Sequence, residues 1–574
     1  MVVSTANQLR STYLLWQRFT YPSENGPKDA IAVPARVGDQ LNSAYTIIIE
    51  MALVRFWSII FGLILYLYLR RHPKPKQAAF DIWNKKADLD ELVTGMFTSK
   101  KTWEKPGPAF ILFLLFLAWV GQTATGVLVP PLILLGSAAP VNPNAIYLPQ
   151  IPLNTDPTTP DYLFQTRLFS LEAPRFLRAL GSTAVNEELR QKVNVDGPIS
   201  IAKTENGEDI QRIDYSYSAT GADFGLQQSP DLILNVSGSC VTDYDLFLGS
   251  EQDDDVDQYT DPTGQAPYIA VSPYDGRQPI ATFFLVKSNL TGALPTSNGT
   301  WTAIISSVNK TSFSASRDPW YFTRGSDTQD TIGDRYVVER GRPALSCWQD
   351  DVWSYQGRKS TVAQLSNDAL PGLNLPQAIQ DVFASVLASP MVAVVGQHLQ
   401  AGALLSSTTS NQELFDAGAS SAYNDLTRLV QGAYVTTVNS LTDLTLYPPG
   451  AASSVPNGAL NPSNQPNDGV GDFVVWSPDV AALDTIVVIV VPSVFLGVWV
   501  IANILMRWTG IGRTVKQLEP EEESDADESN DEPKPSAAAA QQSGSQGNQP
   551  GAKPNQGQTQ TDVELGNNAA GEKR

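Results

Sequence analysis

Histidine and cysteine, the residues with the widest chemical repertoire, are scarce in this 574-residue chain, which holds two of each. His398 is the one histidine of the long central region, so a zinc site built on several histidines is excluded there. A Ser-His-Asp triad needs a single histidine, but no Gly-x-Ser-x-Gly turn accompanies it. We therefore expect His398 to be a hydrogen-bonded residue on a helix surface.

Carboxylates offer a second kind of chemistry. The run EQDDDVD, residues 251–257, is dense enough to attract calcium, which takes about six to eight oxygen ligands. It lacks the glycine and terminal glutamate of an EF-hand, and we favour a solvated acidic loop. Asp350 and Asp351 are adjacent, so on a strand they point to opposite faces and cannot together form the carboxyl pair of a glycosidase. We expect no catalytic residue, no cofactor and no metal ligand.

The two cysteines, Cys240 and Cys347, lie in the same region as every N-glycosylation sequon. In an oxidising compartment an isolated pair of cysteines is most simply one disulfide, and two buried thiols are the alternative. The sequons predict surface sites in a secreted or luminal domain. They begin at Asn235, Asn289, Asn298 and Asn309.

Three apolar stretches predict membrane-spanning helices at residues 45–69, 108–136 and 481–506. Basic residues outnumber acidic ones in the loop 70–107, and short loops with that bias stay on the cytoplasmic side. The N-terminal segment 1–44 and the large region 137–447 are then extracellular.

The expected fold is a membrane α-helical protein with an α+β, β-rich extracellular domain. Within 137–447, helical periodicity around 164–195 is followed by short β-branched runs and then by helical blocks at 376–400 and 411–440. Pro390 should break or kink the first of these blocks. The Pro- and Gly-rich segment 448–480 predicts a flexible tether.

The C-terminal tail, 507–574, is polar and acidic, and its composition predicts a disordered cytoplasmic segment. Ser524 and Ser529 precede acidic residues and are candidate phosphorylation sites. Phosphate would strengthen docking of the tail on the basic loop, and a solvated tail is the simpler alternative. The formal net charge of −20 argues against nucleic acid as a partner.

The motif CWQDDVWS, residues 347–354, resembles one in uncharacterised multi-pass membrane glycoproteins of filamentous fungi that carry a large extracellular domain. The resemblance implies no known activity. From its residues alone, the motif predicts a core element in which two tryptophans pack beside a disulfide.

These observations favour an integral membrane glycoprotein of the plasma membrane or secretory pathway, with an extracellular binding or sensing domain and a regulatory tail. Its expected partners are the bilayer, an extracellular ligand or protein, and further copies of the chain. One alternative is an oligomeric channel of the ligand-gated type, in which Gln122, Thr123 and Thr125 line a pore. Another is an ecto-enzyme that acts on glycans through carboxylates.

Overall fold

The computed structural model describes residues 11–23, 26–71, 93–94, 97–98, 106–149, 160–251, 256–262, 269–271, 280–286, 299–307, 310–325, 336–409, 415–447 and 456–508. The chain divides into two units, Met1–Gln517 and Leu518–Arg574. All the described residues belong to the first unit, so the candidate phosphorylation sites Ser524 and Ser529 lie outside them.

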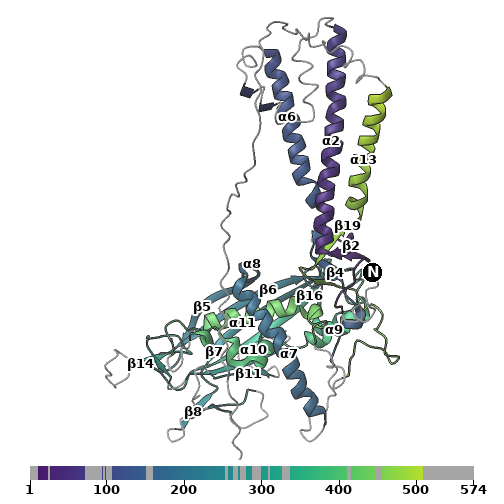
Figure 1. Ribbon diagram of the computed structural model, residues 1–574. Helices are drawn as coiled ribbons and strands as arrows, with labels where there is room; N and C mark the ends of the chain where they lie inside the picture. The colour runs from purple at the N-terminus through teal and green to yellow at the C-terminus, as the bar shows by residue number, and fades with distance from the viewer. Residues whose placement is uncertain are drawn as a thin grey trace, which may run out of the picture. The chain divides into compact units, whose positions relative to one another are not determined.

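Three long helices pack side by side: α2 (Ala35–Arg71), α6 (Pro106–Leu128) and α13 (Thr485–Trp508) (Figure 1). Within the described residues, Phe116–Ile133 and Thr485–Leu505 are long and apolar enough to cross a membrane. A bent pair, Gln377–Val386 with Met391–Thr408, passes the same test if its two halves are taken together. Its residues Phe383 and Val392, however, are buried in the core of the large β-rich domain that follows α6, which we call the outer domain.

The apolar helices differ from their expected bounds at the ends nearest the outer domain. The second predicted span, 108–136, stops at Leu128, because Pro130 and Pro131 cannot continue the helix and begin η1 (Pro130–Ile133). The third, 481–506, starts with a strand and becomes helical only at Thr485. The first, 45–69, lies inside the longer α2, and its membrane crossing stays a prediction.

A small antiparallel sheet, which we call the collar, connects to all three helices. Its strand order is β1 (Arg18–Tyr21), β2 (Lys28–Pro34), β19 (Val480–Asp484) and β3 (Leu134–Gly136). β2 runs directly into α2 and β19 into α13, while β3 follows α6 through η1 (Figure 1). Tyr45 of α2 donates a hydrogen bond to the carbonyl of Val488 in α13 (2.5 Å), which holds these two helices together beside the collar.

The outer domain is built on a seven-stranded antiparallel sheet. The strand order is β11-β12-β16-β7-β6-β5, and β17 pairs with β16. The bounds are β11 (Ile280–Val286), β12 (Gly299–Ser306), β16 (Ala344–Tyr355), β7 (Ile233–Asp243), β6 (Asp209–Thr220), β5 (Val193–Lys203) and β17 (Arg358–Thr361).

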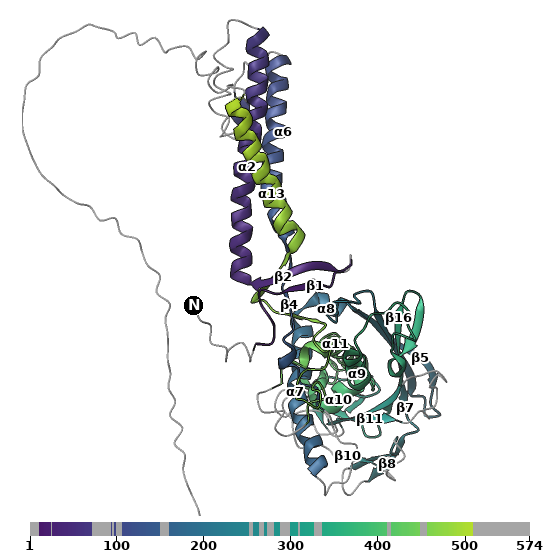
Figure 2. The same ribbon diagram turned by 90° about the vertical axis from the view of Figure 1, so that its right-hand side faces the viewer.

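Helices cover one face of this sheet (Figure 2). They are α7 (Pro160–Val185), α8 (Glu187–Gln191), α9 (Gln377–Val386), α10 (Met391–Leu399), α11 (Ala422–Val438) and α12 (Ser440–Asp443). The break expected at Pro390 is confirmed, because α10 begins directly after this residue. The short β-branched runs expected after residue 195 lie in a region rich in strands, from β5 to β16.

Smaller elements complete the fold. One sheet contains β8 (Phe247–Glu251), β9 (Val256–Tyr259) and β10 (Ile269–Val271), and another contains β13 (Thr311–Ser312), β14 (Thr323–Gly325) and β15 (Tyr336–Val338). β18 (Val474–Trp476) pairs with β4 (Ala138–Pro140) next to the collar. Short 3₁₀ turns occur at η2 (Pro143–Ala145), η3 (Val362–Gln364), η4 (Gln400–Ala403) and η5 (Ser406–Thr408).

Cys240 and Cys347 form the expected disulfide. They are register partners on β7 and β16, with their Cα atoms 4.1 Å apart. The motif at 347–354 is only partly a core element. Trp353 is buried against Phe224 and Phe383, but Trp348 points to the opposite face of the strand and is half-buried.

A buried polar chain crosses the central strands. Tyr215 on β6 donates a hydrogen bond to Gln349 Oε1 on β16 (2.8 Å), and Gln349 Nε2 donates to Asp351 Oδ1 (2.8 Å). β7 lies between these strands, so the tyrosine ring passes over Gly238, its partner in the register. A Cβ atom at Gly238 would overlap the Tyr215 ring, which explains glycine in the middle of this strand.

We expect Gly238→Ala to destabilise the outer domain by about 1 to 3 kcal/mol, because the new methyl group must displace Tyr215 from Gln349. Thermal melting of the full-length chain in detergent would measure the loss. The matched control is Gly181→Ala, since a Cβ at Gly181 in α7 meets open space. Equal melting temperatures for the two variants would contradict the packing argument.

Candidate functional site

A cavity of about 700 Å³ opens beside the collar, and we call it the polar cavity. Its volume falls within the range of about 300 to 1,000 Å³ that is typical of ligand sites. Two of its walls are the loop 466–472 and the start of η2, and Gln228 and residues 374–376 complete it. The polar side chains of its wall are Asn144, Gln228, Asn374, Asn467, Asp468 and Asp472.

Hydrogen bonds and close glycine contacts hold the loop of the polar cavity in place. Asn467 Nδ2 donates to the carbonyl of Gly458 (3.1 Å), and the Asp472 amide donates to the carbonyl of Gly469 (3.0 Å). Gly469 has a positive φ of 74° and touches Pro376, where a Cβ atom would collide. The loop therefore needs little reordering to receive a ligand.

The described lining of the polar cavity carries amides and carboxyls and no lysine, arginine or histidine. Burial raises the pKa of Asp472, and a hydrogen bond from Gln228 partly opposes this shift. Amide and carboxyl oxygens accept hydrogen bonds from hydroxyl and amine groups. The NH2 groups of the four wall amides also donate, so the cavity suits an uncharged polar ligand that both donates and accepts, and its two carboxyl groups disfavour an anion.

The walls of the polar cavity continue, through short strands, into the long helices α6 and α13. Asn144 follows β4 and β3, which come from α6, and Asp472 precedes β18 and β19, which lead to α13. Beside the cavity, the Gln227 side chain accepts a hydrogen bond from the Thr20 amide of β1 (3.1 Å). The Gln227 amide donates to the carbonyl of Asp472 (3.3 Å), so the cavity wall is bonded to a residue that contacts the collar.

These facts correct the prediction of a flexible tether at 448–480. Its described part, 456–480, contains β18 and an ordered loop whose backbone bonds reach Leu148, Gly225 and Val141. Composition missed this order because Pro, Gly and Asn are also the residues that build defined turns.

His398 is a core residue and not the helix-surface histidine that we expected, since its side chain is 10% exposed. Its Nδ1 lies 2.9 Å from the carbonyl of Val394, and its Nε2 lies 3.2 Å from Glu172 Oε2. Each ring nitrogen therefore lies beside an acceptor oxygen, one from a carbonyl and one from a carboxylate.

Glu172 joins His398 to a larger cluster between α7 and α10. Arg175 lies 3.0 Å from Glu172 Oε1, and Tyr447 donates to the same oxygen (3.4 Å). Burial raises the pKa of Glu172, but the His398 hydrogen bond and the Arg175 charge outweigh burial, so the pKa is lowered overall. The Phe176 ring packs on His398 at 4.5 Å between ring centroids. The cluster ties two helices together.

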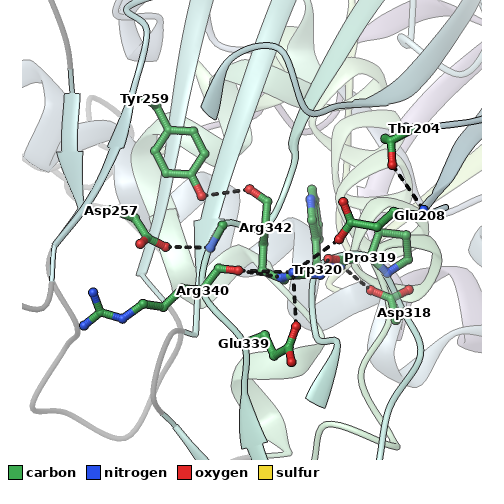
Figure 3. A network of polar contacts seen from close by, with 11 residues as sticks. Thr204, Glu208, Asp257, Tyr259, Asp318, Pro319, Trp320, Glu339, Arg340 and Arg342 are labelled. Carbon is green, nitrogen blue, oxygen red and sulfur yellow. Dashed lines mark hydrogen bonds and ion pairs between the residues drawn. The ribbon is translucent and has the colours of Figure 1, made fainter. Parts of the chain in front are cut away.

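The acidic run 251–257 has one described carboxylate that points into the protein. Asp257 is fully buried and accepts a hydrogen bond from Ser250 Oγ (2.5 Å). It also accepts one from the Gly341 amide (3.1 Å), which Figure 3 shows. Asp253, Asp254 and Asp255 lie outside the described residues. Among the residues that the structure describes, no group of three or more His, Cys, Asp or Glu side chains could hold a metal ion.

Figure 3 shows a second buried group that the sequence did not reveal, centred on Arg342. Its side chain is about 5% exposed and donates to the carbonyls of Arg340 and Pro319. Glu208 and Glu339 lie 3.5 and 3.8 Å from its Nη2. Because backbone carbonyls take most of its donors, Arg342 acts as a cross-link between loops.

The remaining predicted residues are dispersed. Asn235 is exposed on the uncovered face of β7, with its Nδ2 3.1 Å from Ser354 Oγ. Asp351 points inward and Asp350 outward, as alternation requires. Thr125 donates to the carbonyl of Gly121 in its own helix (2.7 Å). The other sequon residues, Asn289, Asn298 and Asn309, lie outside the described residues.

Three buried carboxyl groups make the stability of the domain depend on pH. Burial raises the pKa of Asp351 to about 7, and the pKa values of Asp318 and Asp425 to about 6. Each group binds its proton more tightly in the folded chain than in the unfolded chain. Its stabilising contribution is complete below about pH 4, the pKa of an unfolded aspartate, and is lost as the pH rises through 6 to 7.

We therefore expect the melting temperature to fall between pH 5 and pH 7.5, in a window where Glu172, whose pKa is lowered, does not titrate. Asp351→Asn should flatten this dependence, because the amide needs no proton to be buried. Asp350→Asn on the other face is the control. A melting temperature that rises over this interval, or a slope that Asp351→Asn leaves unchanged, would refute the assignment.

Over residues 173–475 the sequence matches a family model described as a domain of unknown function, DUF8406. The match begins within α7, contains both cysteines and the loop of the polar cavity, and ends in β18. No curated protein and no solved structure matches the chain. Because the match covers more than half of the sequence, this protein belongs to the DUF8406 family.

Proposed function

We propose that this protein is a membrane-embedded receptor glycoprotein whose outer domain binds an extracellular ligand in the polar cavity and couples occupancy to the membrane helices. The observation that carries the proposal is that the walls of the polar cavity are continuous along the chain with two of the long helices. They are made of segments that continue, through short strands of the collar region, into α6 and α13. A ligand that shifts these walls acts on the helices without a long intervening linker.

Membrane insertion has its own support. Large apolar side chains remain exposed along α13, among them Ile486, Ile489 and Val490, which would be costly in water. The disulfide indicates an oxidising compartment for the outer domain. The basic loop 70–107 favours a cytoplasmic position for that loop, which leaves the outer domain outside and the tail 507–574 inside.

The chemistry of the cavity narrows the ligand class. The wall carries side-chain amides and carboxyl groups, which can bond to hydroxyl groups, and the described lining offers no cation for a phosphate or carboxylate. An uncharged polyhydroxylated molecule such as an oligosaccharide fits this lining best. In the part of the chain that the structure describes, the channel and the ecto-enzyme have less support: Thr125 bonds to its own helix, and Asp350 and Asp351 diverge.

Topology provides the first test. We expect glycosidase treatment of membranes to increase the electrophoretic mobility of the protein. Asn235→Gln should reduce this shift by the contribution of one glycan, since Asn235 is exposed in the outer domain. A tag placed in the loop 70–107 should resist protease added outside sealed cells. Cleavage of that tag in sealed cells would reverse the orientation.

Ligand binding provides the second test. Full-length protein in nanodiscs would be screened by thermal shift against neutral oligosaccharides, with anionic sugars for comparison. We expect stabilisation by neutral sugars that Asp468→Asn and Asn374→Ala in the cavity wall weaken about tenfold in affinity. Asp368→Asn is the control, because Asp368 is exposed and does not line the cavity. Preference for anionic sugars, or indifference to the wall variants, would overturn the assignment.

A further inference from the structure

A second cavity lies between the collar and the start of α13, and we call it the collar cavity. Its volume is about 540 Å³, again in the range of ligand sites. Its wall has charges of both signs, Lys28, Asp29 and Asp484, and two apolar residues, Pro27 and Ile486. Thr20, Gln227 and Gln228 complete the wall.

The charged groups of the collar cavity are held at fixed places. Lys28 and Asp29 are the first residues of β2, where the register pairs them with Tyr21 and Thr20. Asp484 ends β19 and accepts hydrogen bonds from the amides of Ile486 (2.9 Å) and Val487 (3.1 Å) at the start of α13. Neither Lys28 nor Asp29 forms an ion pair with another residue of the described ranges.

The position of the collar cavity coincides with one end of a candidate membrane span. The span Thr485–Leu505 begins at the residue after Asp484. Ile486, Ile489 and Val490 are 63%, 56% and 49% exposed, and their spacing places them on one side of α13. An apolar strip therefore starts at the wall of a charged cavity and runs along the helix.

We propose that the collar cavity binds the headgroup of a zwitterionic phospholipid from the outer leaflet. Lys28 pairs with the phosphate, Asp29 and Asp484 face the ammonium group, and the acyl chains lie along the apolar strip of α13. This inference rests on the membrane insertion that the proposed function requires, but it does not depend on a ligand in the polar cavity.

The balance of charge selects the headgroup. One lysine and two aspartates leave the wall of the collar cavity with a net negative charge, which repels the extra negative charge of phosphatidylglycerol or phosphatidylserine. Free inorganic phosphate is disfavoured for the same reason. A choline or ethanolamine headgroup presents one positive and one negative group, which matches the wall.

Occupancy of the two cavities is linked through one side chain. Gln228 lines both the collar cavity and the polar cavity, where it hydrogen-bonds to Asp472. A headgroup that fixes Gln228 restricts the conformations of the wall that a ligand meets. The lipid is then a structural component of the ligand site.

Native mass spectrometry of the full-length chain tests the proposal. The protein would be released from nanodiscs that contain equal amounts of phosphatidylcholine and phosphatidylglycerol. We expect the wild type to retain phosphatidylcholine preferentially, and Lys28→Ala to lower this retention about tenfold, as for the loss of one charge-assisted hydrogen bond. Arg18→Ala is the matched control, because Arg18 is an exposed cation on the neighbouring strand β1 and does not line the cavity.

Extraction of membranes with alkaline carbonate distinguishes failure of the lipid-site proposal from failure of the membrane insertion on which it rests. If the wild type resists extraction but retains both lipids equally, or if Lys28→Ala behaves like Arg18→Ala, only annular lipid is bound and the headgroup site is refuted. If carbonate extracts the wild type, membrane insertion fails, and the lipid site fails with it. Retention of phosphatidylglycerol over phosphatidylcholine would refute the charge argument by itself.

Discussion

The pairing of β19 with β2 is the constraint on which the arrangement of the chain depends. It joins residues 480–484 to residues 30–34 in antiparallel register, so that the strands before α13 and α2 share one ladder of hydrogen bonds. β3 adds to the other side of β19 and brings in α6. Because this ladder joins two segments that are far apart in the sequence, it fixes the positions of α2 and α13 relative to each other.

Small side chains make this pairing compact. Ala30, Ala32 and Ala482 are fully buried where the collar meets β4, and a Cβ atom at Gly38 in α2 would stand 2.6 Å from the Cβ of Ala481. Larger residues here would push the helices away from the sheet. Gly225 serves the same purpose on the outer domain: its backbone passes so close to Val474 that a Cβ would lie 2.7 Å from the Val474 carbonyl oxygen. Close backbone approach thus links the domain to the collar.

The sequence predicted features that depend on a few residues and a simple chemical rule. The disulfide followed from two cysteines in one region of the chain, and the break at Pro390 followed from the missing amide of proline. The sequence did not predict features that depend on which distant segments pack against each other. His398 carries a helix-surface pattern in sequence, yet Glu172 and Phe176 of α7 bury it. The walls of the polar cavity come from residues near 144, 228, 374 and 470, and no local pattern joins them.

The two cavities together limit how a signal can pass through this molecule. A ligand shifts a conformational equilibrium only if it contacts groups that differ between the two states, and coupling between two sites is reciprocal. The inner collar strands β2 and β19 are bonded on both sides, and the disulfide joins the strands β7 and β16 of the outer sheet, so we expect these parts to move as rigid units. Gln227 and Gln228 lie between these rigid parts, one bonded to Thr20 and the other to Asp472. Gln227 and Gln228 therefore offer one route by which a movement of the outer domain reaches the helices, beside the pairing of β18 with β4 and the hydrogen bond from the Val474 amide to the carbonyl of Gly225.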